Sequence, residues 1–375
     1  MEPVYYISSG IFSPLGITAA ANFDAVKKGT VAIKHYPGEN AADPGFCAAA
    51  LSDHQLGLLT LYPQYSPLEA MCIYAVNDAL QSISIGVAGE DCIFVFSSTK
   101  GNIEWLGEKE DRFIYLHHSA QSVAGYFKNP NKPVIVSNAC ISGSLALITA
   151  KRLINAGKYK HAVVIGCDRF SGFVLAGFRS FQAISPEPCR PFDQDRQGIN
   201  LGEAAACIIL STEATAGQKE PVAVLKGGGL SNDANHLSGP SRTGEELAAA
   251  INQALNESGI LPEVVGAVSA HGTATIYNDE MEAKALNLAG VAHAPLHSLK
   301  GYVGHTLGAA GIIESVIACM AMKDRYLPAS PGFEHIGVSR PVNVIARPAI
   351  ESYRYLLKTA SGFGGCNAAL VWEGV

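Results

Sequence analysis

The stretch PVIVSNACISGSLALITAKRLINAGK, residues 133–158, contains the pattern that decides the fold. Its apolar, β-branched start at 134–137 predicts a buried strand, and 142–156 repeats apolar residues at helical spacing. Small residues join the two segments, with Cys140 in the turn and Gly143 at the start of the helix. Strand, turn and helix in this order predict an α/β unit that carries Cys140 at a helix N-terminus.

A second stretch, 297–325, has the same layout. An apolar run at 297–299 leads into a turn that contains His305, and a helical pattern follows. His305 stands three residues before Gly308, as Cys140 stands three before Gly143. A match this short also arises by chance, so the duplication is a hypothesis. A duplicated unit would bring both helix starts to one central site.

Strand-like and helical segments alternate along the rest of the chain, which is typical of strands buried on both faces in α/β layers. We expect further strands at 4–7, 92–96, 162–167, 205–210, 264–269 and 368–372, and further helices at 68–83, 244–257 and 307–323. The apolar pattern breaks at 211–220, so we predict two halves, 1–214 and 215–375. The glycines at 227–229 lack the spacing of a phosphate loop, and we expect a turn at a strand end.

Composition excludes several classes of protein. Hydrophobic residues make up 48% of the 375-residue chain and charged residues 16%, as in a core-rich globular protein. The net charge of −6 argues against a nucleic-acid binder. Nine cysteines without a CxxC pair predict free thiols in a reducing cytoplasm, without a metal. No signal peptide is recognisable, and no run reaches the roughly 20 apolar residues of a membrane span.

Cys140 is the leading candidate nucleophile. The partial positive charge of a helix N-terminus favours thiolate over thiol, and its N–H groups can hold an oxyanion. The alternative is a buried core cysteine, because free cysteine is among the most buried residue types.

Two histidines lie beside glycines, where a ligand can approach the backbone. His271 follows the expected strand at 264–269, and His305 follows Gly304. Both could instead be structural, and nearby Lys300 could be a solvated surface residue. In the segment 361–367, three glycines around Phe363 indicate either a mobile gate or a tight turn.

These segments together resemble the β-ketoacyl-[acyl-carrier-protein] synthase family, in its elongating branch, over nearly the whole chain. The resemblance rests on residues 8–16, Asn138-Ala139-Cys140 with Ser142-Gly143, Arg190-Pro191-Phe192-Asp193 with Arg196, Gly198, Gly202 and Glu203, His271-Gly272-Thr273 with Thr275, Asn278 and Asp279, Lys300 with Gly304-His305, 308–311 and Glu314, and Gly362-Phe363-Gly364-Gly365 with Asn367. Two departures, Thr359-Ala360-Ser361 before Gly362 and Ala204 after Glu203, affect the expected substrate range more than the chemistry.

The resemblance implies an α/β thiolase-like fold of two duplicated halves in αβαβα layers. It implies that Cys140 is the nucleophile and that His271 and His305 are its catalytic partners. Initiating synthases of this fold carry asparagine at the second histidine, and thiolases use a second cysteine. Supporting roles fall to Asp279 and to Lys300 and Glu314, which would hold His305 and the local charge balance. The oxyanion site falls to the N–H groups of Cys140 and Phe363. Substrate contacts fall to Phe178, Phe181, Thr273, Thr275 and Gly364. Phe178 and Phe181 could equally be core aromatics.

The implied reaction is a decarboxylating condensation of an acyl thioester with malonyl-acyl carrier protein, in fatty acid or polyketide- and polyene-type biosynthesis, without a cofactor. The expected partners are acyl carrier proteins bearing acyl and malonyl thioesters and a second copy of the chain. An alternative is a subunit that binds acyl chains beside a synthase-like paralogue in an obligate heterodimer. A thiolase and a cysteine hydrolase are weaker alternatives.

Overall fold

The computed structural model describes residues 2–38, 43, 45–216, 220–235 and 237–375. Its main feature is one eleven-stranded sheet in the order β13-β11-β10-β15-β16-β9-β1-β8-β6-β4-β5. These strands are β1 (Tyr5–Phe12), β4 (Cys92–Ser97), β5 (Val134–Val136), β6 (His161–Asp168), β8 (Ala204–Ser211), β9 (Ala223–Asn232), β10 (Ala267–Ser269), β11 (Pro295–His297), β13 (Asn343–Val344), β15 (Tyr355–Gly362) and β16 (Cys366–Gly374). Two small sheets contain β2 (Lys34–Tyr36), β3 (Phe46–Ala49) and β7 (Leu201–Gly202), and β12 (Tyr326–Leu327) and β14 (Ala349–Ile350).

The helices of the described residues alternate with these strands. They are α1 (Ala19–Lys27), α2 (Asp53–Leu59), α3 (Pro67–Leu80), α4 (Leu116–Tyr126), α5 (Ser142–Asn155), α6 (Gly172–Ser180), α7 (Glu245–Ser258), α8 (Ile276–Leu288), α9 (Lys300–Val303) and α10 (Ala310–Lys323). Short 3-10 turns are η1 (Ile103–Trp105), η2 (Asp111–Phe113), η3 (Ala214–Ala216), η4 (Pro262–Val264) and η5 (Leu307–Ala309). The strand expected at 264–269 therefore begins only at Ala267, after η4, and the helix expected from 307 begins as η5.

The sheet is built from two halves with the same strand order. Reading inwards from each edge, β5-β4-β6-β8-β1 corresponds to β11-β10-β15-β16-β9, and β13 extends the second edge. In both halves the first three strands are parallel and the later pairs are antiparallel. The halves join where Tyr5 and Tyr6 of β1 pair with Val224 and Ala223 of β9. The predicted duplication is confirmed. The boundary at 214/215 stays a prediction, and residues 217–219 of the expected join lie outside the described residues.

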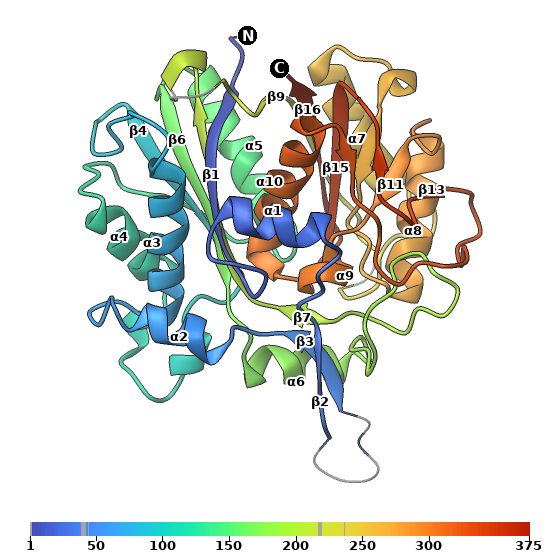
Figure 1. The fold of residues 1–375 in the computed structure, drawn as a ribbon, viewed down its shortest axis with the longest axis horizontal. Coiled ribbons are helices and arrows are strands. Elements are labelled where there is room, and N and C mark those ends of the chain that lie inside the picture. The colour runs from blue at the N-terminus through green and yellow to red at the C-terminus, as the bar shows by residue number, and fades with distance from the viewer. Residues whose placement is uncertain (1, 39–42, 44, 217–219, 236) are drawn as a thin grey trace.

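The helices and strands form five layers (Figure 1). α5 and α10 lie between the two halves of the sheet, α3 and α4 cover the outer face of the first half, and α7 and α8 that of the second. Along β6, Ala162 and Val164 join the central core, whereas Val163 and Ile165 join the outer core. Strands buried on both faces explain the continuous apolar runs. The predicted αβαβα arrangement is therefore confirmed.

Small residues let α5 and α10 meet at their N-terminal ends. A Cβ added at Gly143 would lie 2.9 Å from the Gly308 carbonyl oxygen, and one at Gly311 would lie 2.3 Å from the Ser144 nitrogen. Larger side chains would force the two helices apart. The turns that precede them, with Cys140 and His305, are thereby brought to the same place.

The prediction that Gly227, Gly228 and Gly229 form a turn at a strand end was wrong. They lie inside β9 and pair with residues 369–371 of β16. α7 crosses so close that a Cβ at Gly229 would lie 1.9 Å from the Ala250 carbonyl oxygen. The glycines serve close packing of a helix on a strand.

The segment 361–367 is a tight turn. β15 ends at Gly362 and β16 begins at Cys366. Gly364 and Gly365, with φ of 82° and 77°, have the left-handed backbone that favours glycine.

Within the described part of the chain, no helix combines the length and apolar character that a membrane crossing requires.

Candidate active site

Cys140 lies in the turn between β5 and α5. The turn is held by Ser142, whose Oγ accepts a hydrogen bond from the Asn138 nitrogen at 2.8 Å and donates one to the Ala139 carbonyl at 2.7 Å. Ala139 has a φ of 43°, so the chain reverses sharply before the helix. Cys140 is only 7% exposed and lines a cavity.

Burial raises the pKa of the Cys140 thiol to about 12, and neighbouring Cys366 acts in the same direction, while Lys300 opposes the shift. The expectation of a thiolate is therefore not met in this structure. The physical reason is the apolar surroundings, in which Cys140 packs with Val174 and Leu307. A neutral thiol is the favoured form at neutral pH.

His305 follows α9 and is anchored through its backbone, whose nitrogen donates to the Asn200 carbonyl at 2.7 Å. The Leu307 N–H donates to His305 Nδ1 at 3.3 Å, so the proton of the neutral ring is on Nε2. Nε2 is buried and has no partner among the described residues. Burial, reinforced by Lys300 and Lys358, holds the pKa of His305 well below its usual value. The ring is thus a neutral donor that lines the cavity.

His271 follows β10, and its nitrogen donates to Glu282 Oε1 at 2.8 Å. Lys300 Nζ lies 3.3 Å from His271 Nδ1, and an ammonium there leaves Nδ1 as the acceptor and the ring proton on Nε2. Burial, then Lys300 and His305, hold the pKa of His271 well below its usual value. The two histidine rings lie edge to face with centroids 5.3 Å apart.

A buried ionic network lies behind His271. The ammonium of Lys300, a fully buried residue, lies 2.7 Å from Glu314 Oε1 and 2.5 Å from the His271 carbonyl oxygen. Lys358 Nζ lies 2.8 Å from the other oxygen, Glu314 Oε2. Burial alone would raise the pKa of Glu314, but the two lysines hold it below its usual value. Lys300 is therefore not the solvated lysine of the alternative interpretation.

Asp279 supports the loop after His271 rather than the cavity. Its carboxylate accepts hydrogen bonds from the nitrogens of Thr273 at 2.9 Å, Ala274 at 3.1 Å and Phe192 at 2.7 Å. Burial raises the pKa of Asp279 to about 6.

The hydroxyls of Thr273 and Thr275 lie 2.9 Å apart, and both residues line the cavity.

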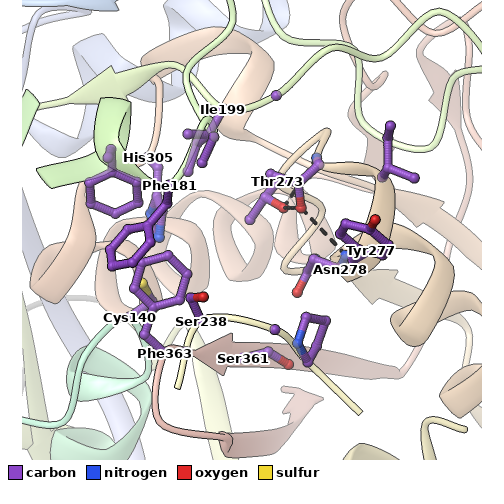
Figure 2. A pocket seen from close by; sticks show the side chains of 18 of the residues that line it. Cys140, Phe181, Ile199, Ser238, Thr273, Tyr277, Asn278, His305, Ser361 and Phe363 are labelled. Atoms are coloured by element: carbon purple, nitrogen blue, oxygen red, sulfur yellow. Dashed lines mark hydrogen bonds between the residues drawn. The ribbon is translucent and has the colours of Figure 1, made fainter. Parts of the chain in front are cut away.

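The cavity has a volume of about 420 Å³. Figure 2 shows Cys140, Phe181 and Phe363 on one wall and Thr273, Tyr277 and Asn278 on the opposite wall. Two further groups of residues line it: 197–199, which include Gly198 of the expected motif, and 237–240, which were not singled out from the sequence.

Three aromatic rings form one end of the cavity. Phe363 stacks on Phe178 with centroids 5.5 Å apart and meets Phe181 edge-on at 5.3 Å. Phe178 and Phe181 therefore line the cavity and are not core aromatics. Gly364, expected to contact substrate, is not among the lining residues, because the turn directs its N–H to the Leu237 carbonyl at 2.7 Å.

Sequence reasoning missed Lys358 and Glu282. Lys358 is a lysine inside an otherwise apolar strand run, which is a recognisable signal, and Glu282 follows Asp279 by one helical turn. Glu282 accepts hydrogen bonds from the nitrogens of His271 and Gly272, both at 2.8 Å. No group of three or more His, Cys, Asp or Glu within the described residues is placed to hold a metal ion.

The duplicated five-layer fold, and a buried cysteine that lines one cavity with two neutral histidines, define a thiolase-like protein. Residues 122–216 match the family model of the β-ketoacyl synthase N-terminal domain, and residues 222–334 match that of its C-terminal domain. The chain belongs to the β-ketoacyl synthase family. It is 30% identical to 3-oxoacyl-[acyl-carrier-protein] synthase 2 of Vibrio cholerae, over 97% of each chain. It is 29% identical to the synthase of the same name from Vibrio harveyi, over 97% of this chain and 96% of the relative.

Solved structures show the same fold. A chain of the ketosynthase in complex with its chain length factor from Xenorhabdus doucetiae superposes with a TM-score of 0.83 at 26% identity, covering 100% of this chain and 98% of that one. The ishigamide ketosynthase/chain length factor gives a TM-score of 0.89 at 25% identity, covering 100% and 99%.

Proposed function

We propose that this protein catalyses the decarboxylating condensation of an acyl thioester with malonyl-acyl carrier protein, giving a β-ketoacyl thioester. The observation that carries the proposal is the meeting of Cys140 with two neutral, fixed histidines at one cavity. The curated relatives are 3-oxoacyl-[acyl-carrier-protein] synthases, which supports an acyl carrier protein as the bearer of both substrates.

In the first half-reaction the sulfur of Cys140 attacks the acyl carbonyl. The carrier thiolate leaves and takes up the proton that the Cys140 thiol loses. The developing oxyanion accepts hydrogen bonds from the backbone N–H groups of Cys140 and Phe363. The close approach of the two backbone segments supports this assignment, since a Cβ at Gly362 would lie 3.0 Å from the Cys140 nitrogen.

In the second half-reaction malonyl-carrier loses carbon dioxide, and the electron pair of the broken bond forms an enolate. The Nε2–H groups of His271 and His305 donate to the enolate oxygen and stabilise its charge. The enolate carbon attacks the acyl carbonyl on Cys140, and the Cys140 sulfur leaves and regains a proton. Lys300 fixes the tautomer of His271, and the Leu307 N–H fixes that of His305.

We further propose that the chain works as a dimer in the cytoplasm. All nine cysteines are free, which supports a reducing compartment. The partner is a second copy or a synthase-like paralogue. Two of the structural relatives are a ketosynthase with a chain length factor, which favours the second candidate, a heterodimer. Cys140 with both histidines supports an active subunit rather than a purely accessory one.

The test is the intact mass of the purified protein after addition of an acyl-carrier thioester and then malonyl-carrier. We expect an acyl adduct that disappears with malonyl-carrier, together with β-ketoacyl product and carbon dioxide. Cys140→Ala should form no adduct, whereas Cys319→Ala, a buried thiol of α10, should behave as the wild type.

The other outcomes separate the alternatives. A stable adduct that malonyl-carrier cannot discharge would indicate a missing partner or another extender. The absence of an adduct with any chain length would favour an accessory subunit. Activity on acyl-CoA without carbon dioxide release would favour a thiolase, and release of free acid by water a hydrolase.

A further inference from the structure

Lys358 of β15 is fully buried, like Lys300, although burying an ammonium is costly unless it is paired. Its Nζ donates a hydrogen bond to the carbonyl oxygen of Thr359 and forms an ion pair with Glu314 Oε2 at 2.8 Å. Within β15, Lys358 pairs with Ser269 of β10, two residues before His271. This lysine lies behind the cavity wall and has no part in the chemistry proposed above.

Glu314 links Lys358 to the cavity. One carboxylate oxygen is held by Lys358, and the other lies 2.7 Å from Lys300 Nζ. Lys300 in turn lies 2.5 Å from the His271 carbonyl oxygen and 3.3 Å from His271 Nδ1. The orientation of Glu314 therefore depends on Lys358, and the position of Lys300 depends on Glu314.

We propose that Lys358 is a positioning residue of the condensation step, a role that rests on the proposed function. Through Glu314 it holds Lys300 against His271 Nδ1 and so keeps the Nε2–H of His271 directed at the enolate. It touches no reacting atom. Its loss should impair decarboxylation and condensation but not the acylation of Cys140, which uses the backbone donors of another segment.

The charge of Lys358 has a second effect on the condensation step, through the pKa of the two histidines. It faces Glu314 of α10, Glu282 of α8, Lys300 of α9 and His297 of β11, beside His271 and His305. Burial lowers the pKa of His297 to about 4, so this ring is neutral, and the cations face two carboxylates. After burial and Lys300, the charge of Lys358 further lowers the pKa of both catalytic histidines.

The test substitution is Lys358→Met, which removes the charge and retains the length of the side chain. We expect acylation of Cys140 within about twofold of the wild type and condensation reduced about 10- to 100-fold, as for removal of other residues that orient an active-site group. The acid limb of the condensation rate should move to higher pH, because the histidines protonate more readily once the charge of Lys358 is removed. The control is Lys151→Met, which removes another buried, ion-paired lysine near the opposite end of α5.

Equal loss of acylation and condensation, or an unmoved acid limb, would reduce Lys358 to a structural residue and overturn the proposal. Should Lys358→Met fail to fold, as judged by its thermal midpoint, Lys358→Gln keeps a donor but not the charge and must show the same shift of the acid limb. The wild type measured in parallel separates the two ideas. If the wild type itself forms no acyl adduct and releases no carbon dioxide, the proposed function fails, whatever Lys358 does.

Discussion

His305→Ala removes one of the two donors expected to stabilise the enolate. In the folded protein Nε2 has no partner among the described residues, and the ring is fixed by the Leu307 N–H on Nδ1 at 3.3 Å. The donor is thus directed before substrate arrives, and no reorganisation is needed when charge develops. In the proposed mechanism, acylation of Cys140 uses backbone donors instead. We therefore expect the substitution to impair the second half-reaction selectively.

The magnitude follows from the loss of one preorganised donor to an oxyanion. Such a loss costs about 10²- to 10³-fold in rate, or about 2.7–4 kcal/mol of transition-state stabilisation. The substitution also leaves the buried Leu307 N–H without an acceptor, which costs roughly 1–3 kcal/mol of stability. The protein should therefore be less stable but still folded, and the catalytic effect must be measured below the lowered thermal midpoint.

The assay follows both half-reactions on the same protein. Intact mass gives the rate at which Cys140 is acylated, and carbon dioxide release from malonyl-carrier gives the rate of decarboxylation. The matched control is His161→Ala, because His161 is also buried and bonded, with Nδ1 3.0 Å from Ser211 Oγ on β8. Should His305→Ala slow acylation as much as decarboxylation, its assignment as an enolate donor would be wrong.

Four further predictions concern the gate, the scaffold and, in two cases, the pH dependence. Phe363→Ala should change the rate of acyl entry, measured by acylation with several chain lengths, and unchanged kinetics at every length would exclude a gate. Gly311→Ala should lower the thermal midpoint, because its Cβ would strike the backbone of α5 and overpacking costs about 1–3 kcal/mol of stability. The control Gly177→Ala, inside α6, meets nothing within 4 Å and should leave the protein as stable or up to about 1 kcal/mol more stable. Alkylation of Cys140 in the free protein should rise with pH without a plateau near neutrality, because the pKa of the thiol is about 12, and a plateau by pH ~8 would contradict its burial. Condensation should persist below the usual histidine pKa of about 6.5, because the neutral rings are lost only as pH falls through their lowered values.

The layered fold was predictable because its signals are local. Each strand buried on both faces has a continuous apolar run, and the helix after Cys140 has its own periodicity. The glycines at 227–229 gave a misleading signal, because the same residue type serves turns and close packing. Only the position of α7, set by a distant part of the chain, distinguishes the two uses.

The site was predictable as far as motifs reach. Cys140, His271 and His305 line one cavity. Lys300 and Glu314 lie beside it as a pair, but Lys300 contacts His271 and not the expected His305. The neutral thiol could not be predicted, since helix position favours the thiolate and only the packed structure shows how strongly burial opposes it. Lys358, the second lysine paired with Glu314, was missed for a related reason. The partner of a lysine inside a strand can be identified only when the positions of the neighbouring strands and helices are known.

The two halves share a topology, yet their equivalent strands end differently. β6 ends at Asp168, whose carboxylate accepts a hydrogen bond from the Gly308 nitrogen at 2.7 Å and so closes the start of η5 and α10. β15, in the equivalent place, ends at Gly362 beside the start of α5, where a Cβ would lie 3.0 Å from the Cys140 nitrogen. A carboxylate there would lie beside the proposed oxyanion position and would repel the charge that the proposed reaction creates. The residue at the end of each strand, rather than the duplicated scaffold, thus leaves one helix start open to substrate and closes the other.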